Sequence, residues 1–254
     1  MEISELAARY DERLRTADFA DVDASANGLQ VGPDEADVEH VAFAVDAVAE
    51  TAERAVAAGA DALVTHHGVS WSGIERVTGR QYGRIDPLLS NDVALYVSHL
   101  PLDGHPELGN AAGVADLLDL SAREGVGHVG AETIGVRGAT GGMDRDDVHE
   151  TLESELDHGG AGVRVLDFGP ERIEDVAIVT GAGADFLDEA VAAGADTLIL
   201  GEAKGKTYHE SKEAGLNVFV GTHYGTETFG VRSLMGLADD WGLETTYLDA
   251  PTGL

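Results

Sequence analysis

Short apolar runs alternate along the chain with longer segments that are rich in alanine. Residues 41–45 form an apolar run that predicts a strand, and residues 47–58 carry alanine and valine at the spacing of a helix. Gly59 follows, and glycine is the residue that most readily ends a helix. Residues 62–64 and 93–97 predict two further strands. This strand–helix–strand order predicts an α/β fold.

Both ends of the chain predict amphipathic helices. Ile3, Leu6, Tyr10 and Leu14 share one helical face near the N-terminus. Residues 226–241 predict a final helix whose apolar stripe has five members: Val231, Leu234, Leu237, Ala238 and Trp241.

The strand–helix–strand pattern that begins at residue 41 occurs twice in the chain. The heptad AVAAGAD at residues 55–61 recurs at residues 190–196, each time before an apolar strand. The later segment ALYVSH (94–99) is echoed by VFVGTH (218–223), so a second strand in each copy runs on to a histidine. Two matches in the same order predict an internal duplication and two related α/β lobes.

We place the first lobe at residues 1–125, joined by the C-terminal segment at about 220–254, and the second lobe at 126–219. The second lobe is predicted to contain a strand at 134–136 and a helix at 145–156. Glycine-rich residues 138–142 and the run 157–162 predict turns within it.

The strong negative charge of the chain limits the classes of molecule that it can bind. There are 47 acidic and 16 basic residues, a formal net charge of −31 at pH 7. A nucleic-acid clamp is therefore disfavoured, because binders of phosphate backbones concentrate positive charge. The acidic, lysine-poor composition is typical of salt-adapted proteins. With no signal-like N-terminus and no apolar run of ~20 residues, we expect a cytoplasmic protein that does not enter a membrane.

Three strand ends carry side chains that bind metals. His66 and His67 follow one strand, His99 and Asp103 the next, and His223 and Glu227 the equivalent strand of the second copy. Ligands of open α/β sheets bind at the carboxyl ends of strands. The chain has no cysteine, so thiolate sites are excluded. Imidazole and carboxylate donors suit Zn, Mn, Fe, Co or Ni.

Other readings of these segments are weaker. Ser98, His99 and Asp103 could suggest a hydrolase triad, but no Gly-x-Ser-x-Gly turn is present. No His-Glu-x-x-His motif indicates a zinc protease. Gly181 and Gly183 lie between a strand and a helix, yet Phe186 stands where a dinucleotide loop needs its third glycine, which favours a plain tight turn.

Four ordered motifs carry a resemblance to a known family. They are NGLQVG (27–32), THHG (65–68), LPLDGHPELGN (100–110) and GTHYGTE (221–227). In these the chain resembles the NIF-three-like dinuclear metal centre family, whose members are also labelled GTP cyclohydrolase I type 2 homologues. The resemblance runs from Asn27 to the final helix.

The resemblance implies a ligand set and an architecture. His66 and His67 match the family's paired histidines, Asp103 its aspartate, and His223 and Glu227 its C-terminal ligands, with the glutamate bridging two divalent ions. It further implies a metal site in the cleft between two related lobes, and a homohexamer built as a trimer of dimers.

Two function classes follow. The first is a metal-dependent hydrolase that acts on a small substrate through a metal-bridging hydroxide. The alternative is a carrier that binds a metal, or the precursor of a metal cofactor, without turnover. The "cyclohydrolase" label is treated as a family label, since no guanine pocket can be read from the sequence.

Further residues are candidates for supporting roles. His99 is the best candidate for a proton-transfer residue, and Asn27 is expected to fix a turn. Arg80 and Arg84 lie in a glycine-containing basic stretch, 74–84, that could cover the site and bind a substrate phosphate, with a mobile loop as the simpler interpretation. Glu202, His209 and Glu210 occupy the place in the second copy that corresponds to His66 and His67.

Overall fold

The computed structural model describes residues 1–254, and the chain divides into two compact units. Unit 1 comprises Met1–Leu102 and Gly230–Ala250, and unit 2 comprises Asp103–Phe229 and Pro251–Leu254. The division therefore lies before the boundary expected near residue 125. The physical reason is helix α5 (Asn110–Leu117), whose Ala111, Val114 and Ala115 are buried in the core of unit 2.

Unit 1 contains a five-stranded sheet with the order β1-β4-β3-β2-β11. Its strands are β1 (Gly28–Val31), β2 (His40–Asp46), β3 (Ala62–His67), β4 (Ala94–Val97) and β11 (Glu244–Tyr247). Strands β11, β2, β3 and β4 are parallel, and β1 pairs antiparallel with β4 at the edge. The carboxyl ends of the parallel strands therefore meet at one edge of the sheet.

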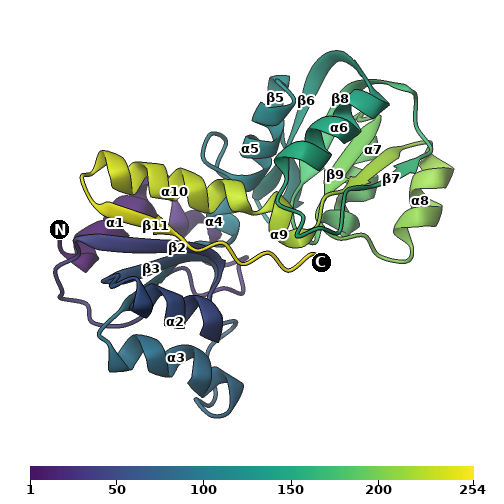
Figure 1. Ribbon diagram of the computed structural model, residues 1–254. Helices are drawn as coiled ribbons and strands as arrows, with labels where there is room; N and C mark the ends of the chain where they lie inside the picture. The colour runs from purple at the N-terminus through teal and green to yellow at the C-terminus, as the bar shows by residue number, and fades with distance from the viewer. The chain divides into compact units, whose positions relative to one another are not determined.

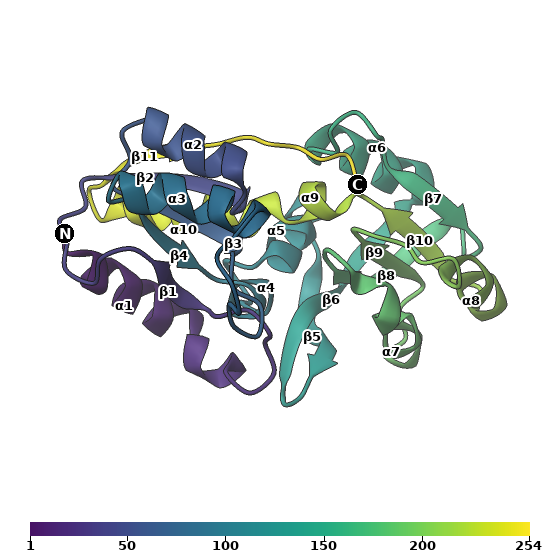
Figure 2. The same cartoon turned by 90° about the horizontal axis from the view of Figure 1, so that it is seen from below.

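Helices cover both faces of this sheet (Figures 1 and 2). On one face lie α2 (Ala49–Ala57) and α3 (Arg80–Ser90), whose apolar residues share a core with β2, β3 and β4. On the other lie α1 (Ile3–Leu14), followed by the short helix η1 (Thr16–Phe19), and α10 (Thr228–Asp240). The Tyr10 hydroxyl donates to the Leu234 carbonyl at 2.9 Å, which ties α1 to α10.

Unit 2 contains a six-stranded mixed sheet with the order β5-β6-β8-β9-β10-β7. The strands are β5 (Ser121–Val129), β6 (Glu132–Asp144), β7 (Arg164–Asp167), β8 (Arg172–Val179), β9 (Thr197–Leu200) and β10 (Asn217–Val220). Helices α5 and α6 (Arg145–Glu155) cover one face, and α7 (Leu187–Ala192) and α8 (Thr207–Ala214) cover the other (Figure 2). The short helices η2 (Gly183–Phe186), α9 (His223–Thr226) and, at the unit boundary, α4 (Leu100–Asp103) complete the chain.

The two sheets share a central motif of three adjacent parallel strands, β2-β3-β4 and β8-β9-β10. The aspartate of each AVAAGAD heptad plays the same part in it. Asp61 Oδ2 accepts the backbone N–H groups of Glu39 and His40 at 2.9 and 3.0 Å. Asp196 Oδ2 accepts those of Glu174 and Asp175 at 2.8 and 3.2 Å. The expectation of two related α/β lobes is confirmed.

Two predicted elements differ from the structure. Residues 138–142 do not form a turn between elements but lie within β6, where the pairing with β8 shifts register between Ala139 and Met143. Gly141 and Gly142 have φ values of 75° and 93°, so the glycines permit a bulge inside a continuing strand. The helix expected over 226–241 is interrupted at Glu227, where α9 ends and α10 begins at Thr228. None of the helices is long and apolar enough to cross a membrane.

Candidate metal centre

Three histidines gather at the carboxyl end of the parallel strands in unit 1. His66 and His67 end β3, and His99 follows β4 by two residues. The nitrogens that they offer lie within 4.8 Å of one another. The ring centroid of His66 is 4.6 Å from that of His67 and 5.1 Å from that of His99. The strand order alone brings them together, because β3 and β4 are neighbours in register.

Each of these imidazoles has an oxygen acceptor beside Nδ1. His66 Nδ1 lies 2.9 Å from the Ser98 carbonyl oxygen, and His67 Nδ1 lies 2.9 Å from Asp46 Oδ1. His99 Nδ1 lies 2.9 Å from Asp23 Oδ1. A carbonyl or a carboxylate can only accept, so each Nδ1 carries a proton and Nε2 is the ring nitrogen that would bind a metal. Metal-binding histidines are oriented in this way.

Asp23 is held ionised beside His99. Besides that imidazole, its carboxylate accepts the backbone N–H groups of Ser25 and Leu100 and the Asn27 side-chain amide, each at 2.8–2.9 Å. Burial works against the charge, but the hydrogen bonds and the charge of His99 prevail and lower the pKa of Asp23 to about 2. Asn27 also accepts the backbone N–H of His99 at 2.8 Å, so its side chain links Asp23 to the segment that follows β4.

The loop after β3 is anchored by Gln30 on β1. Its Oε1 accepts the N–H groups of Val69 and Ser70 at 2.9 and 3.2 Å. A Cβ at Gly68 would overlap the Gln30 side-chain amide, so a larger residue there would displace this anchor. The anchored loop presents Trp71, whose ring stands edge-on to His99 with the centroids 4.9 Å apart. Trp71 is 42% exposed, so it forms an apolar wall at the surface beside the histidines.

Unit 2 carries a second set of donors, Asp103, His223 and Glu227. Asp103 and Glu227 are buried, and a ligand oxygen of each lies within 4.8 Å of the other. The Asn110 amide donates to Asp103 Oδ1 at 2.8 Å and holds it in place. His223 Nε2 lies 3.1 Å from Glu227 Oε2, and its Nδ1 lies 2.6 Å from Glu202 Oε1. Among the candidate site residues, His223 is thus the fourth imidazole whose Nδ1 faces an oxygen acceptor.

The charge of these carboxylates changes the titration of His223. Burial disfavours its charged form, but the hydrogen bonds and charges of Glu227 and Glu202 are stronger and raise its pKa to about 9. In the absence of a metal, a proton therefore occupies this donor at neutral pH. A divalent ion would take the place of that proton.

The backbone around Glu227 is shaped to fit its side chain. Gly181, after β8, has a φ of 57°, and a Cβ there would overlap Glu227 Oε1 and lie 3.1 Å from His223 Nε2. The Thr226 hydroxyl oxygen accepts the Gly181 N–H at 3.1 Å. Thr222 has a φ of 67°, which is unusual for threonine, and its Oγ1 accepts the Gly225 N–H and so caps α9. The turn at Gly181 therefore makes room for the side chains of Glu227 and His223.

The family described as Duf34/NIF3 (NGG1p interacting factor 3) matches residues 1–252. A Halobacterium salinarum protein named "GTP cyclohydrolase 1 type 2 homolog" is 53% identical over the full length of both chains. One of the same name from Archaeoglobus fulgidus is 39% identical, again over both full lengths.

The chain belongs to the Duf34/NIF3 family. Among solved structures, TTHA1606 from Thermus thermophilus is 35% identical, with a TM-score of 0.89 over all of both chains. Protein ybgI, described as of unknown function, is 34% identical with a TM-score of 0.90 over all of both chains. These neighbours confirm the fold.

The structure assigns the predicted site residues of this NIF3-family chain to its two units. His66, His67 and His99 cluster in unit 1, and Asp103, His223 and Glu227 cluster in unit 2. The carboxylate partner of His99 is Asp23, so a Ser98–His99–Asp103 triad is not formed. Glu202 bonds to His223, whereas Glu210 of α8 pairs with Lys206.

Arg80 and Arg84 lie in the first turns of α3, and neither forms an ion pair. The residue of this region that contacts the histidines is Trp71, which precedes the basic stretch in the chain. The sequence alone did not indicate a role for Asp23, Asp46 or Trp71. Asp23 lies in an irregular segment, 76 positions from His99, with no periodic pattern to mark it.

Proposed function

We propose that His66, His67, Asp103, His223 and Glu227 together bind two divalent metal ions in one dinuclear centre, and that the protein is a metal-dependent hydrolase. The observation that carries the proposal is the shared orientation of the imidazoles, each with an oxygen acceptor at Nδ1. That arrangement makes Nε2 the ring nitrogen that would bind a metal and is expected of metal donors. The residue types fit Zn, Fe, Mn, Co or Ni, so the identity of the metal stays open.

The composition of the donor set favours two ions that are incompletely coordinated. Three imidazoles, one aspartate and one shared glutamate would supply about three protein ligands to each ion. Structural metal sites are closed by four protein ligands, whereas catalytic sites keep open positions. Two carboxylates would balance only half of the charge of two divalent ions. The remaining charge suits an anionic substrate oxygen.

Two divalent ions would polarise a substrate oxygen and lower the pKa of a water that they hold. The residues of the chain would supply orientation and proton transfer. His99 is held by the ionised Asp23 at Nδ1, so its Nε2 can accept a proton and the carboxylate stabilises the resulting imidazolium. Glu202 would fix the ring of His223 in the same manner. His99 is thus the proposed general base.

The proposed substrate is a small molecule, with a phosphorylated one as the first choice. Arg80 and Arg84 support that choice because both are arginines without a carboxylate partner in a strongly acidic chain. The names of the relatives make GTP one compound to test. We propose no guanine-specific contact.

The test is the metal content of the purified protein together with a screen of GTP and phosphoesters for hydrolysis. Elemental analysis should find two ions per chain in the wild type and fewer in His66→Ala and in Glu227→Gln. His128→Asn is the matched control, because His128 is exposed and pairs with Glu189 away from the donors. Full metal content in both donor variants would overturn the assignment.

A metal carrier is the second candidate, and the titration of His223 favours it. A donor whose pKa is raised to about 9 holds its proton against a metal at neutral pH, which promotes exchange. A carrier would pass its ions to a chelating acceptor within minutes and would hydrolyse no substrate repeatedly. Retained ions and many turnovers per chain would identify the hydrolase.

A further inference from the structure

A cavity of about 470 Å³ opens in unit 2 at the carboxyl ends of β9 and β10. Its lining includes Gly201 and Glu202, which follow β9, and Val220 and Thr222 at the end of β10. Open α/β sheets bind their ligands at this edge, and pockets of ~300–1,000 Å³ hold small organic molecules. All of the lining residues belong to unit 2, so the cavity is complete within that unit.

Arg164 is the one basic side chain that lines this cavity. It stands at the start of β7, directly opposite Val220 in the antiparallel ladder. The side chain is exposed and forms no ion pair, although acidic residues outnumber basic ones 47 to 16 in the chain. An unpaired guanidinium at a cavity offers a planar set of donors to a phosphate or a carboxylate.

The rest of the lining is suited to a compact apolar group. Ala161, Ala203 and Val220 contribute small apolar side chains, and glycines form much of the remaining wall. The one carboxylate side chain in the lining, Glu202, is engaged by His223, with 2.6 Å between Oε1 and Nδ1, and the backbone oxygen of Leu254, the last residue of the chain, accepts the His223 N–H. The cavity therefore combines one available cation with an apolar floor.

We propose that this cavity binds a small organic anion, with its phosphate or carboxylate group on Arg164 and its apolar body over Val220 and Ala203. Anion binding by the cavity stands independently of the metal centre. Its role as a substrate pocket rests on the proposed function, because it depends on Glu202, which bonds to the metal donor His223.

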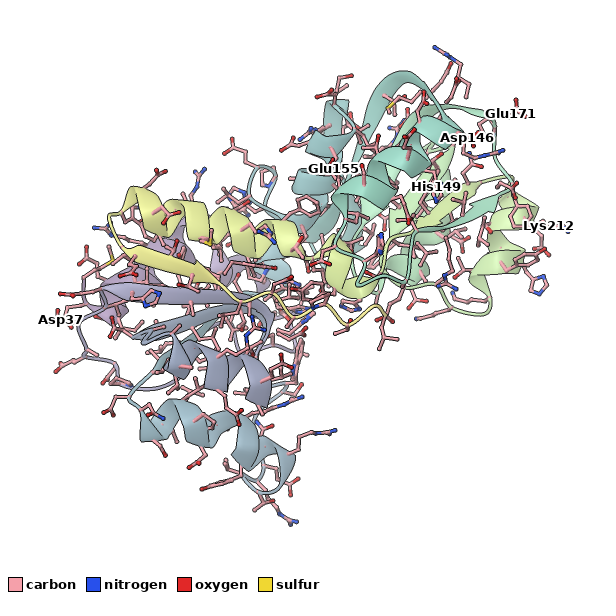
Figure 3. All side chains as sticks on the ribbon, in the orientation of Figure 1. Asp37, Asp146, His149, Glu155, Glu171 and Lys212 are labelled. Atoms are coloured by element: carbon pink, nitrogen blue, oxygen red, sulfur yellow. The ribbon has the colours of Figure 1, made fainter.

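The experiment titrates metal-free protein with phenyl phosphate, benzoate and phenol and follows ligand-observed NMR. Metal-free protein is used so that the probes cannot bind directly to a metal. The test variant is Arg164→Gln. The matched control is Arg145→Gln, which removes the same charge from unit 2 but lies in a different cavity, among Asp144, Asp146 and Glu171 (Figure 3 labels Asp146 and Glu171).

The proposal expects an anionic probe to bind the wild type and Arg145→Gln equally, and Arg164→Gln roughly tenfold more weakly, as expected for the loss of a charge-assisted hydrogen bond. Tighter binding of phenyl phosphate would identify a phosphate ligand, and tighter binding of benzoate a carboxylate. Binding of phenol as tight as that of the anions, equal binding by Arg164→Gln, or no binding by the wild type would overturn it.

Elemental analysis of the same variants separates this proposal from the proposed function. Arg164→Gln should retain the metal content of the wild type, because Arg164 is not a metal donor. If the wild type binds the anionic probe but no metal, the proposed function fails and the anion site stands. If it binds metal but no probe, the anion site fails alone.

Discussion

Substitution of Gly181 by alanine should separate the metal centre from the stability of the fold. Gly181 has a φ of 57°, and the added Cβ would overlap Glu227 Oε1. The left-handed backbone costs a non-glycine residue about 1 kcal/mol. The overlap must also be relieved. Because Glu227 is buried, its carboxylate can move away from the added Cβ only by leaving its place beside His223.

Gly215→Ala is the matched control for this substitution. Gly215 ends α8 with a φ of 66°, and the nearest atom to its added Cβ is 3.9 Å away. Both variants should therefore lose about 1 kcal/mol of unfolding free energy, a fall in Tm of roughly 2–4 °C for a chain of this size. In Gly181→Ala only, the displaced Glu227 should also lower the metal affinity, by roughly 10–100-fold.

The assay combines thermal unfolding of metal-free protein with calorimetric titration of Zn²⁺ or Mn²⁺. Gly181→Ala should resemble Gly215→Ala in the first measurement and bind metal far more weakly in the second. Wild-type metal affinity in Gly181→Ala would show that Glu227 is not a ligand in this position. An equal loss of affinity in Gly215→Ala would show that the effect comes from stability alone.

Three further results are expected. Metal binding at pH 7 should release about one proton from His223, whose pKa is raised to about 9, and the metal affinity should rise with pH up to that value. Calorimetric titration in buffers of different ionisation enthalpy measures the proton release. A binding enthalpy that does not depend on the buffer would contradict the prediction. Asp23→Asn should keep the bound metal but shift the pH–rate profile, because His99 loses its ionised partner; an unchanged profile would remove His99 from proton transfer. Asp61→Ala and Asp196→Ala should each lower unfolding free energy by about 1–3 kcal/mol in denaturant titrations, since each frees two backbone donors, and a loss in only one variant would argue against their equivalence.

The sequence predicts the two related lobes because the heptad and its following strand are local patterns. Asp61 and Asp196 confirm the equivalence by binding the same two backbone donors in each copy. The histidines proposed as metal ligands are predictable for a related reason, since they come at the ends of apolar strands. The end of a strand can be located from the local sequence, and it determines which edge of the sheet a side chain lies at.

The partners that orient those histidines could not be predicted. Asp23 and Asp46 are two of 47 acidic residues, and nothing local distinguishes them from the carboxylates of an acidic surface. Their roles depend on contacts across 76 and 21 positions. The break in the final helix at Glu227 was hidden for a similar reason, because Glu227 leaves the helical conformation (φ −113°, ψ 10°) at a position that the apolar stripe of the helix does not mark.

Electron paramagnetic resonance of protein loaded with two equivalents of Mn²⁺ tests most directly whether the proposed donors hold two ions in one dinuclear centre. Ions that share Glu227 at a separation of ~3.5–4 Å should give an exchange-coupled spectrum in the wild type. Glu227→Gln should abolish the coupling. Two independent, uncoupled six-line signals in the wild type would contradict the account.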